Sequence, residues 1–385
     1  MHDRRRFLAG LASAALFPVA ARAQVSIPRW RSDPFTLGVA SGYPRPDGFV
    51  LWTRLAPVPL APGGGVAPDA VIPVQWEVAR DDGFRQVAAR GEVFATAGFA
   101  HSVHVEPTGL EPGLPYWYRF HCGQATSATG RTATAPAPGA ALTRLRIDTG
   151  SCQQYEHGYY AAYRQVAADP PDVFLRLGDY IYELTWGQDL VRHHDAPECY
   201  TLDDYRIRHA LYRLDPNLQA AHAACPWLFT WDDHEVDNDY AGDVSEELDP
   251  PAAFRRRRAA AYRAYYEHLP LPRRAVPLGA NLRLHAALGF GDLAQVVMLD
   301  GRQFRSPQAC PPPGRSGGST TLCRDLEDPA RTMLGGPQEQ WLAARLAGSR
   351  ARWNLLGQGV VMTRVDEQAG PGERFWTDSW NGYPA

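Results

Sequence analysis

A cluster of carboxylates follows directly on an apolar run at residues 229–239, which read FTWDDHEVDND. Five acidic groups this close repel one another unless each is solvated or all of them share a cation. Residues 224–231 read ACPWLFTW, a pattern that predicts a strand entering a core, where water does not surround each charge. The sequence therefore predicts a cation site at the end of this strand. The alternative is a capped turn with solvated acids.

Polar side chains follow three other predicted strands in the same way. In open α/β sheets, ligands bind beyond the carboxyl ends of the strands, so neighbouring strands would bring these groups to one crevice. The groups at the four strand ends are Ser151 and Cys152, then Asp179, Tyr180, Tyr182 and Glu183, then Asp232, Asp233 and His234, then Asp300, Arg302 and Arg305.

The motif GDYIY at residues 178–182 is the sharpest of these signals. Asp179 and Tyr182 are three residues apart, so one helical turn would direct both side chains the same way. A phenol becomes a useful ligand only when a strongly Lewis-acidic ion deprotonates it, and ferric iron does this well. The alternative is that Asp179 caps a helix while Tyr182 packs in the core.

Cys152 is a further candidate ligand. Beside a helix N-terminus its thiolate would be favoured and would bind a metal. Taken alone, a buried small residue or a disulfide partner is the favoured interpretation, and Asp148 is the competing ligand from the same strand.

Within the acidic stretch, we interpret Asp233 as a metal-binding carboxylate and His234 as a group that protonates a leaving oxygen or holds a phosphoryl oxygen. Asn238 and Asp239 add hard oxygen ligands suited to calcium. The run RRRR at residues 255–258 is expected to be a solvent-exposed helix face, because consecutive helical residues point in different directions and cannot all bind one phosphate.

The first 23 residues are interpreted as an export signal. A twin arginine, Arg4 and Arg5, precedes a short apolar stretch and then Ala-Arg-Ala at residues 21–23, with small residues at the cleavage site, the pattern of a cleaved twin-arginine signal peptide. The apolar stretch is too short to span a bilayer. We therefore expect the twin-arginine export machinery as a partner, a periplasmic or secreted location, and no membrane span. A frayed basic terminus is the alternative.

The rest of the chain predicts two domains of different pattern. Residues 30–138 alternate short apolar runs with turn signals, which favours a β-sandwich of the fibronectin III or immunoglobulin type. Residues 141–385 alternate strands and helices, which favours an α/β layered domain. A net charge of only −3 argues against nucleic-acid binding driven by phosphate neutralisation.

Six cysteines in an exported chain invite disulfides. Cys310 and Cys323 flank a Pro/Gly-rich loop and are the best pair, whereas Cys199 with Cys225 is a weaker possibility.

Six motifs together resemble those of a known family: SCQQYEHGYYAAY, LGDYIYE, TLDDYRIRHALYR, WDDHEVDNDYAG, LDGRQFR and WNLLGQGVVM. The chain is similar over nearly its whole length after the signal to the PhoD-type alkaline phosphatases and phosphodiesterases. These are a branch of the calcineurin-like metallophosphoesterases. The resemblance implies a β-sandwich followed by a metallophosphoesterase αββα layered domain, and a phosphoester as substrate.

The resemblance also implies a site that holds Fe3+ and Ca2+. Iron would be held by Cys152, Asp179 and Tyr182, and Asp179 would bridge to calcium with Asp233 and Asn238 nearby. His234 would stand where the related enzymes keep the histidine of their Asn-His-Asp/Glu motif.

A mechanism follows from this assignment. The cations would polarise the phosphate and lower the pKa of bound water, while His234 protonates the leaving alcohol and Arg302 clamps phosphate oxygens.

One departure from the family pattern affects the expected fold. Family members continue past the segment that matches residues 379–384 to a strand ending in Gly-Asp-x-His, which adds metal ligands. Here no histidine follows His285, and Asn381 stands where an aspartate is usual. We therefore expect the domain at 141–385 to be incomplete and to expose apolar surface where late strands are missing.

Two alternative functions remain at this point. One is a non-catalytic, metal-stabilised binding protein on the same scaffold, which the incomplete domain favours. The other is a glycosidase, which gives no role to Cys152 or Tyr182 and ranks last.

Overall fold

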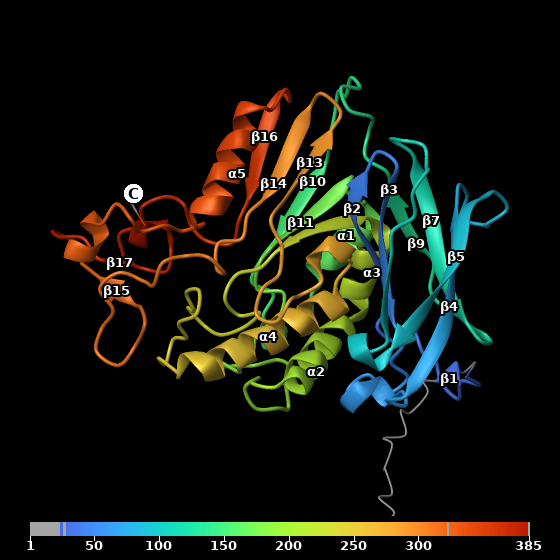
Figure 1. Cartoon of the computed structure of the whole chain (residues 1–385), viewed down its shortest axis with the longest axis horizontal. Helices are drawn as coiled ribbons and strands as arrows, with labels where there is room; N and C mark the ends of the chain where they lie inside the picture. The colour runs from blue at the N-terminus through green and yellow to red at the C-terminus, as the bar shows by residue number, and fades with distance from the viewer. Residues whose placement is uncertain (1–23, 26–27, 322, 384–385) are drawn as a thin grey trace, which may run out of the picture.

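The computed structural model describes residues 24–25, 28–321 and 323–383 (Figure 1). The predicted export signal at residues 1–23 lies outside this described part. Figure 1 shows the chain as layers, with the outer sheet of an N-terminal sandwich on the right, α5 and β16 on the left, and a mixed sheet between them.

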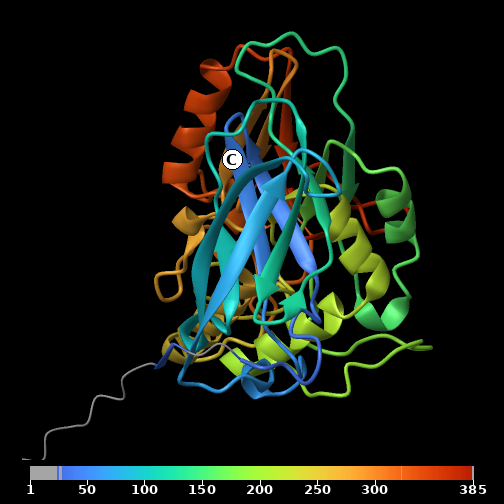
Figure 2. The same cartoon turned by 90° about the vertical axis from the view of Figure 1, so that its right-hand side faces the viewer.

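The outer sheet of the sandwich is formed by short N-terminal strands and faces the viewer in Figure 2. Its strands are β1 (Gln24–Val25), β4 (Ala70–Ala79), β5 (Val87–Thr96), β7 (Pro115–Cys122), β8 (Ala125–Thr126) and β9 (Gly130–Ala133). Alternate side chains of β7, Tyr116, Tyr118 and Phe120, are buried between the layers. This alternation is the two-residue period that the sequence predicted.

The second sheet runs across the predicted boundary between the two domains. Its order is β10-β11-β12-β2-β3-β6, formed by β2 (Val39–Arg45), β3 (Gly48–Arg54), β6 (Ser102–Val105), β10 (Ile147–Gly150), β11 (Val173–Leu177) and β12 (Pro226–Thr230). Strand β12 pairs parallel with β2, with Trp227 opposite Gly42. A Cβ atom on Gly42 would lie 2.6 Å from the carbonyl oxygen of Trp227, so only glycine allows this approach. The sequence analysis did not predict this junction.

Helices cover this sheet and share its core. They are α1 (Ala162–Ala168), α2 (Leu202–Arg213), α3 (Pro216–Ala224) and α4 (Pro251–His268). Helix α2 begins with a capping box between Thr201 and Asp204, and α3 begins with Asp215 accepting from two backbone N–H groups. Apolar residues of all four helices form one core cluster with the side chains of β11 and β12.

A smaller sheet and α5 form the remaining layer. Its strands are β13 (Ala286–Phe290), β14 (Ala294–Met298) and β16 (Trp353–Gly357), and α5 spans Gly336–Ala347. Strand β16 lies at the edge of this sheet, and its side chains of Trp353 (67% exposed), Leu355 (37%) and Leu356 (39%) are open to solvent.

Short elements complete the described chain. They are β15 (Ser319–Thr320), β17 (Phe375–Trp376), and the 3₁₀ helices η1 (Pro62–Gly65), η2 (Ala97–Phe99), η3 (Tyr155–His157), η4 (Arg273–Ala275), η5 (Arg324–Glu327) and η6 (Trp380–Gly382). Across the described residues, we find no helix with the length and apolar character needed to cross a bilayer.

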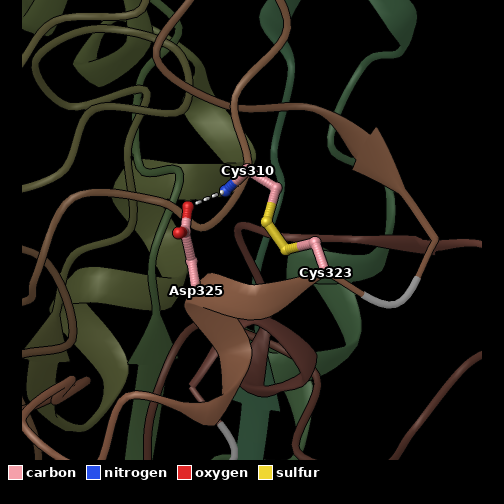
Figure 3. Close-up of side chains that lie close together, drawn as sticks. All are labelled: Cys310, Cys323 and Asp325. Atoms are coloured by element: carbon pink, nitrogen blue, oxygen red, sulfur yellow. Dashed lines mark hydrogen bonds between the residues drawn. A yellow bond between two sulfur atoms is a disulfide. The ribbon is translucent and has the colours of Figure 1, made fainter.

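The predicted disulfide between Cys310 and Cys323 is confirmed (Figure 3). The backbone N–H of Cys310 also donates to Asp325 at 3.0 Å. The weaker pairing of Cys199 with Cys225 is wrong, because both thiols are free and buried. The Cys225 sulfur instead faces the carbonyl oxygen of Ala221 in α3.

The predicted solvent face at residues 255–258 is wrong for half of the run. Arg257 and Arg258 are buried in α4, and only the first two arginines are exposed. Arg257 pairs with Asp237 at 2.7 Å and with Glu198 at 2.6 Å. Consecutive helical residues are about 100° apart, so a run of four must cover both faces of a helix.

Buried histidines should make the folded protein sensitive to acid. Burial, followed by the charge of Arg54, lowers the pKa of His209 to about 3, whereas an unfolded histidine takes up its proton near pH 6.5. Below pH 6.5 the unfolded state therefore binds more protons than the folded state. As the pH is lowered through this range, the free energy of unfolding falls by about 1.4 kcal/mol per pH unit for each such group. Thermal unfolding between pH 7.5 and 4.5 should show this decline.

The variant His209→Phe should flatten the decline, because phenylalanine keeps the ring and removes the titrating group. His193 is exposed and provides the matched control. An equal flattening by His193→Phe would contradict the assignment to His209.

Candidate metal centre

The carboxyl ends of three parallel strands bring the predicted ligands together. Strands β10, β11 and β12 are adjacent and parallel, so their ends meet at one edge of the sheet. Cys152 follows β10, Asp179 and Tyr182 follow β11, and Asp233 and His234 follow β12. This arrangement is the one that the sequence predicted from the strand ends.

The loops at this edge have an unusual backbone. Gly178 (φ 107°) leads out of β11, and a Cβ atom there would lie 2.6 Å from that of Asp232. Cys152 and Asp179 both adopt the left-handed region, at φ 51° and 52°. Non-glycine residues in this region are uncommon and gather at functional sites. The backbone N–H of Cys152 donates to the Gly178 carbonyl at 3.3 Å and ties the two loops together.

The chemistry of the donor set fits a metal ion. Asp179, Asp233 and His234 offer ligand atoms that all lie within 4.8 Å of one another. The hydroxyl of Tyr182 donates to Oδ2 of Asp179 at 2.9 Å, while Oδ1 of Asp179 is buried with no hydrogen-bond partner. A buried carboxylate oxygen without a partner is costly, and a cation would satisfy it.

Electrostatics in the metal-free chain raise the pKa values of three candidate donors, Asp179, Cys152 and Tyr182. Burial, followed by the charge of Asp233, raises the pKa of Asp179. Cys152 reaches solvent on one side, yet desolvation and then the charge of Asp179 raise the pKa of its thiol to about 11. The same two causes raise the pKa of Tyr182. A cation that binds here must displace protons, as is usual at thiolate and phenolate sites.

The expected helix N-terminus beside Cys152 is not found. The residues after Cys152 lead into η3, and α1 begins only at Ala162. The prediction of a thiolate favoured by a helix N-terminus is therefore wrong, and a bound cation would favour the thiolate instead.

His234 is held by a carboxylate whose role the sequence analysis missed. Nδ1 of the imidazole lies 2.8 Å from Oε2 of the buried Glu183, and the ring stacks on Tyr182 with centroids 4.1 Å apart. Burial alone would lower the pKa of His234, but the charges of Glu183 and Asp233 outweigh it and raise the pKa well above its usual value. Glu183 is the last residue of the motif LGDYIYE, and its place in that motif is the sequence signal that could have indicated its role.

Asn238 lies in the loop that carries Asp233. Its backbone N–H donates to Oε1 of Glu183 at 2.8 Å, and its side-chain amide donates to Glu246 at 2.9 Å. The N–H of the next residue, Asp239, donates to Oδ2 of Asp233 at 2.7 Å. Asn238 is thus fixed between Glu183 and Glu246.

Arg302 is buried among carboxylates. Its two terminal nitrogens donate to both oxygens of Asp378, at 2.6 and 2.5 Å, and Nε donates to Asp232 at 2.6 Å. Asp233 lies 3.5 Å away. Burial alone would raise the pKa of Asp233, but the charges of Arg302 and His234 outweigh it and hold that pKa below its usual range. These partners engage the guanidinium, so Arg302 holds carboxylates here, and its role as a phosphate clamp stays a prediction.

The described residues contain three other clusters of potential ligands; one of them, Asp233, Asp239 and Asp378, includes two of the carboxylates that Arg302 contacts. The ligand groups of the other two clusters are already engaged. Glu183, Glu198 and Asp237 gather within 4.8 Å, but Arg257 binds the latter two. Cys310 and Cys323 lie beside Asp325, but their sulfurs are bonded to each other (Figure 3). Neither cluster is left with a free set of ligands.

Comparison with known proteins decides the family. Residues 147–385 match the family model described as PhoD-like phosphatase, and residues 20–136 match the model of its N-terminal domain. The chain belongs to the PhoD-like phosphatase family. The resemblance seen in the sequence motifs is therefore confirmed.

Two relatives of this PhoD-like phosphatase extend the comparison. Alkaline phosphatase D of Bacillus subtilis (strain 168) is 45% identical over 396 residues, which covers all of this chain and 67% of that protein. The solved structure titled "Structure of PhoD" superposes with a TM-score of 0.89 at 47% identity, over 93% of this chain and 68% of the other. The predicted fold class is confirmed, and the chain spans about two thirds of the length of these relatives.

Removal of the buried guanidinium group of Arg302 should destabilise the fold. The variant Arg302→Leu leaves Asp232 and Asp233 without their guanidinium partner and Asp378 with Arg305 alone, which should lower the free energy of unfolding by about 3–5 kcal/mol. Denaturant unfolding of the metal-free protein measures this change. Arg255→Leu removes an exposed arginine and is the control, with an expected loss below about 1 kcal/mol. Equal losses in the two variants would contradict the prediction.

Proposed function

We propose that this PhoD-like phosphatase is a metal-dependent phosphoester hydrolase that releases phosphate from extracytoplasmic phosphoesters with the aid of Fe3+ and Ca2+. The family and the relatives support the phosphoesterase activity. The observation that carries the site is the unpartnered, buried oxygen of Asp179 beside Tyr182, Cys152 and Asp233.

The choice of metals follows from the donor chemistry. The sulfur of Cys152 and the phenol of Tyr182 would hold iron, because a ferric ion is acidic enough to deprotonate both. Asp179 has one oxygen facing Tyr182 and one without a partner, and would bridge iron to calcium. Asp233 and the amide oxygen of Asn238 are hard ligands of the kind that calcium prefers. Bound cations of this kind polarise the phosphate and lower the pKa of water.

The residues of the chain perform the proton transfer. Glu183 holds Nδ1 of His234 at 2.8 Å, which leaves Nε2 as the nitrogen that faces substrate. The raised pKa of His234 keeps a proton there, so the ring donates it to the leaving oxygen. In this scheme the buried Arg302 acts through its contacts with Asp232 and Asp233, whose orientation it fixes. Contact with the phosphate is not required for that role.

Export by the twin-arginine machinery to the periplasm or the medium is part of the proposal. Arg4 and Arg5 in the N-terminal segment support it, and so does the Cys310–Cys323 disulfide, since such bonds persist in oxidising compartments. Cell fractionation of the Arg4→Lys, Arg5→Lys double variant checks it, with retention in the cytoplasm expected.

Hydrolysis should depend on His234. With iron and calcium present, wild-type protein should cleave p-nitrophenyl phosphate or bis-p-nitrophenyl phosphate, and His234→Ala should lower kcat/KM by roughly 100- to 10,000-fold with metal content unchanged. His193→Ala, at an exposed position, is the control. A parallel loss of metal would place His234 among the ligands, and wild-type protein that binds metal without hydrolysis would indicate a binding protein.

Iron bound through Tyr182 should give a visible ferric-phenolate colour. Tyr182→Phe removes the phenolate and should abolish the absorption band of the purified protein. Tyr200→Phe replaces an exposed tyrosine and should leave the band intact. An unchanged band in Tyr182→Phe would reject the iron assignment.

A further inference from the structure

The side chain of Asn238 is oriented by a carboxylate outside the proposed ligand set. Nδ2 of Asn238 donates to Oε2 of Glu246 at 2.9 Å. A carboxylate only accepts hydrogen bonds, so the atom of Asn238 that faces it must be the amide nitrogen. The amide oxygen of Asn238 is therefore turned away from Glu246, and this oxygen is the atom able to bind a cation.

The backbone around Asn238 is held by hydrogen bonds to Glu183 and Asp233. Its N–H donates to Glu183, the same carboxylate that holds His234, and the following N–H, of Asp239, donates to Asp233. With the backbone held by these bonds and the amide nitrogen held by Glu246, the remaining freedom of the side chain is small.

Glu246 is itself held in place by three contacts. Its backbone N–H donates to Oδ2 of Asp237 at 3.2 Å, and its carbonyl oxygen accepts from the N–H of Ser316 at 3.0 Å. Its second carboxylate oxygen, Oε1, accepts from Arg315 at 2.6 Å. Its side chain is only 16% exposed. The two oxygens of Glu246 thus accept from different partners, Oε2 from Asn238 and Oε1 from Arg315.

Arg315 and Ser316 belong to the loop that the Cys310–Cys323 disulfide closes (Figure 3). The same loop is tied to the C-terminal segment, because Thr377 and Gly318 exchange hydrogen bonds between their backbone and side-chain groups. The disulfide loop therefore holds Glu246 through Arg315 and Ser316.

We propose that Glu246 is a positioning residue which, supported by Arg315 of the disulfide loop, holds the Asn238 amide with its oxygen directed to calcium. This inference rests on the proposed function, because it takes Asn238 as a calcium ligand. Residues that hold a ligand typically change metal affinity by 10- to 100-fold when they are removed, since the freed side chain must be ordered again on binding.

Calcium affinity of the full-length protein, measured by titration calorimetry after chelator treatment, tests the proposal without an activity assay. Glu246→Ala should weaken calcium binding by about tenfold or more. Glu246→Gln should restore part of the affinity, because its amide oxygen still accepts from Asn238, although its amide nitrogen cannot accept from Arg315.

Glu247 provides the matched control for charge. It is the neighbouring glutamate, its side chain is 64% exposed, and it lies 3.4 Å from Arg315 with no contact to Asn238. Glu247→Ala removes the same charge and should change calcium affinity by less than about twofold. Thermal unfolding of the metal-free variants reports whether each one is folded.

Two results would overturn the proposal while leaving the proposed function intact. One is a Glu246→Gln protein as weak as Glu246→Ala, which would assign the effect to charge. The other is an equal loss in Glu247→Ala. If Glu246→Ala does not fold, Arg315→Ala replaces it, and unchanged calcium affinity in that variant would overturn the proposal. Wild-type protein without calcium binding would overturn the inference and the calcium assignment together, while hydrolysis and the iron colour test the rest of the proposed function separately.

Discussion

The repulsion among the carboxylates around Arg302 is the constraint on which the structure at the carboxyl ends of β10, β11 and β12 depends. Asp232, Asp233 and Asp378 come from two distant segments and lie close together, with Asp233 and Asp378 buried, an arrangement that is unfavourable without a counter-charge. Arg302 supplies that charge to all three and Arg305 adds a second contact to Asp378, while the two bonds from Arg302 to Asp378 also fix the C-terminal segment against the loop after β12. The position of the proposed ligand Asp233 therefore follows from an interaction that does not involve metal.

The presence or absence of partners for the carboxylates distinguishes the proposed metal centre from the other acidic clusters. Where Arg257 or Arg302 lies among the acids, the negative charge is compensated within the protein. At Asp179, in contrast, one carboxylate oxygen is buried without a hydrogen-bond partner. That unpartnered oxygen, more than the number of acids, supports the proposed cation position.

The sequence predicted which residues gather at the candidate site, because strand ends are local features. The motifs after β10, β11 and β12 gave Cys152, Asp179, Tyr182 and Asp233, and parallel pairing brings them to one edge. The partners of these residues were missed. The contact of Arg302 with Asp378 joins positions far apart in the chain, and no local pattern records it.

Errors in the sequence analysis share a cause. The burial of Arg257 depends on acids from other segments, and the free thiols of Cys199 and Cys225 depend on tertiary packing. The fold class was predictable from the alternation of strands and helices, whereas the joining of the two halves through β2 and β12 depended on a long-range pairing at Gly42. That pairing is visible only in the structure.

The pairing of β2 with β12 bears on how this chain is made. Strand β2 lies early in the sequence, yet its neighbour in the sheet is supplied by residues 226–227. During synthesis the N-terminal strands leave the ribosome first and keep one unpaired edge until more than half of the chain has emerged. Such an edge is a template for pairing with other chains, so the nascent protein needs protection from aggregation during that interval.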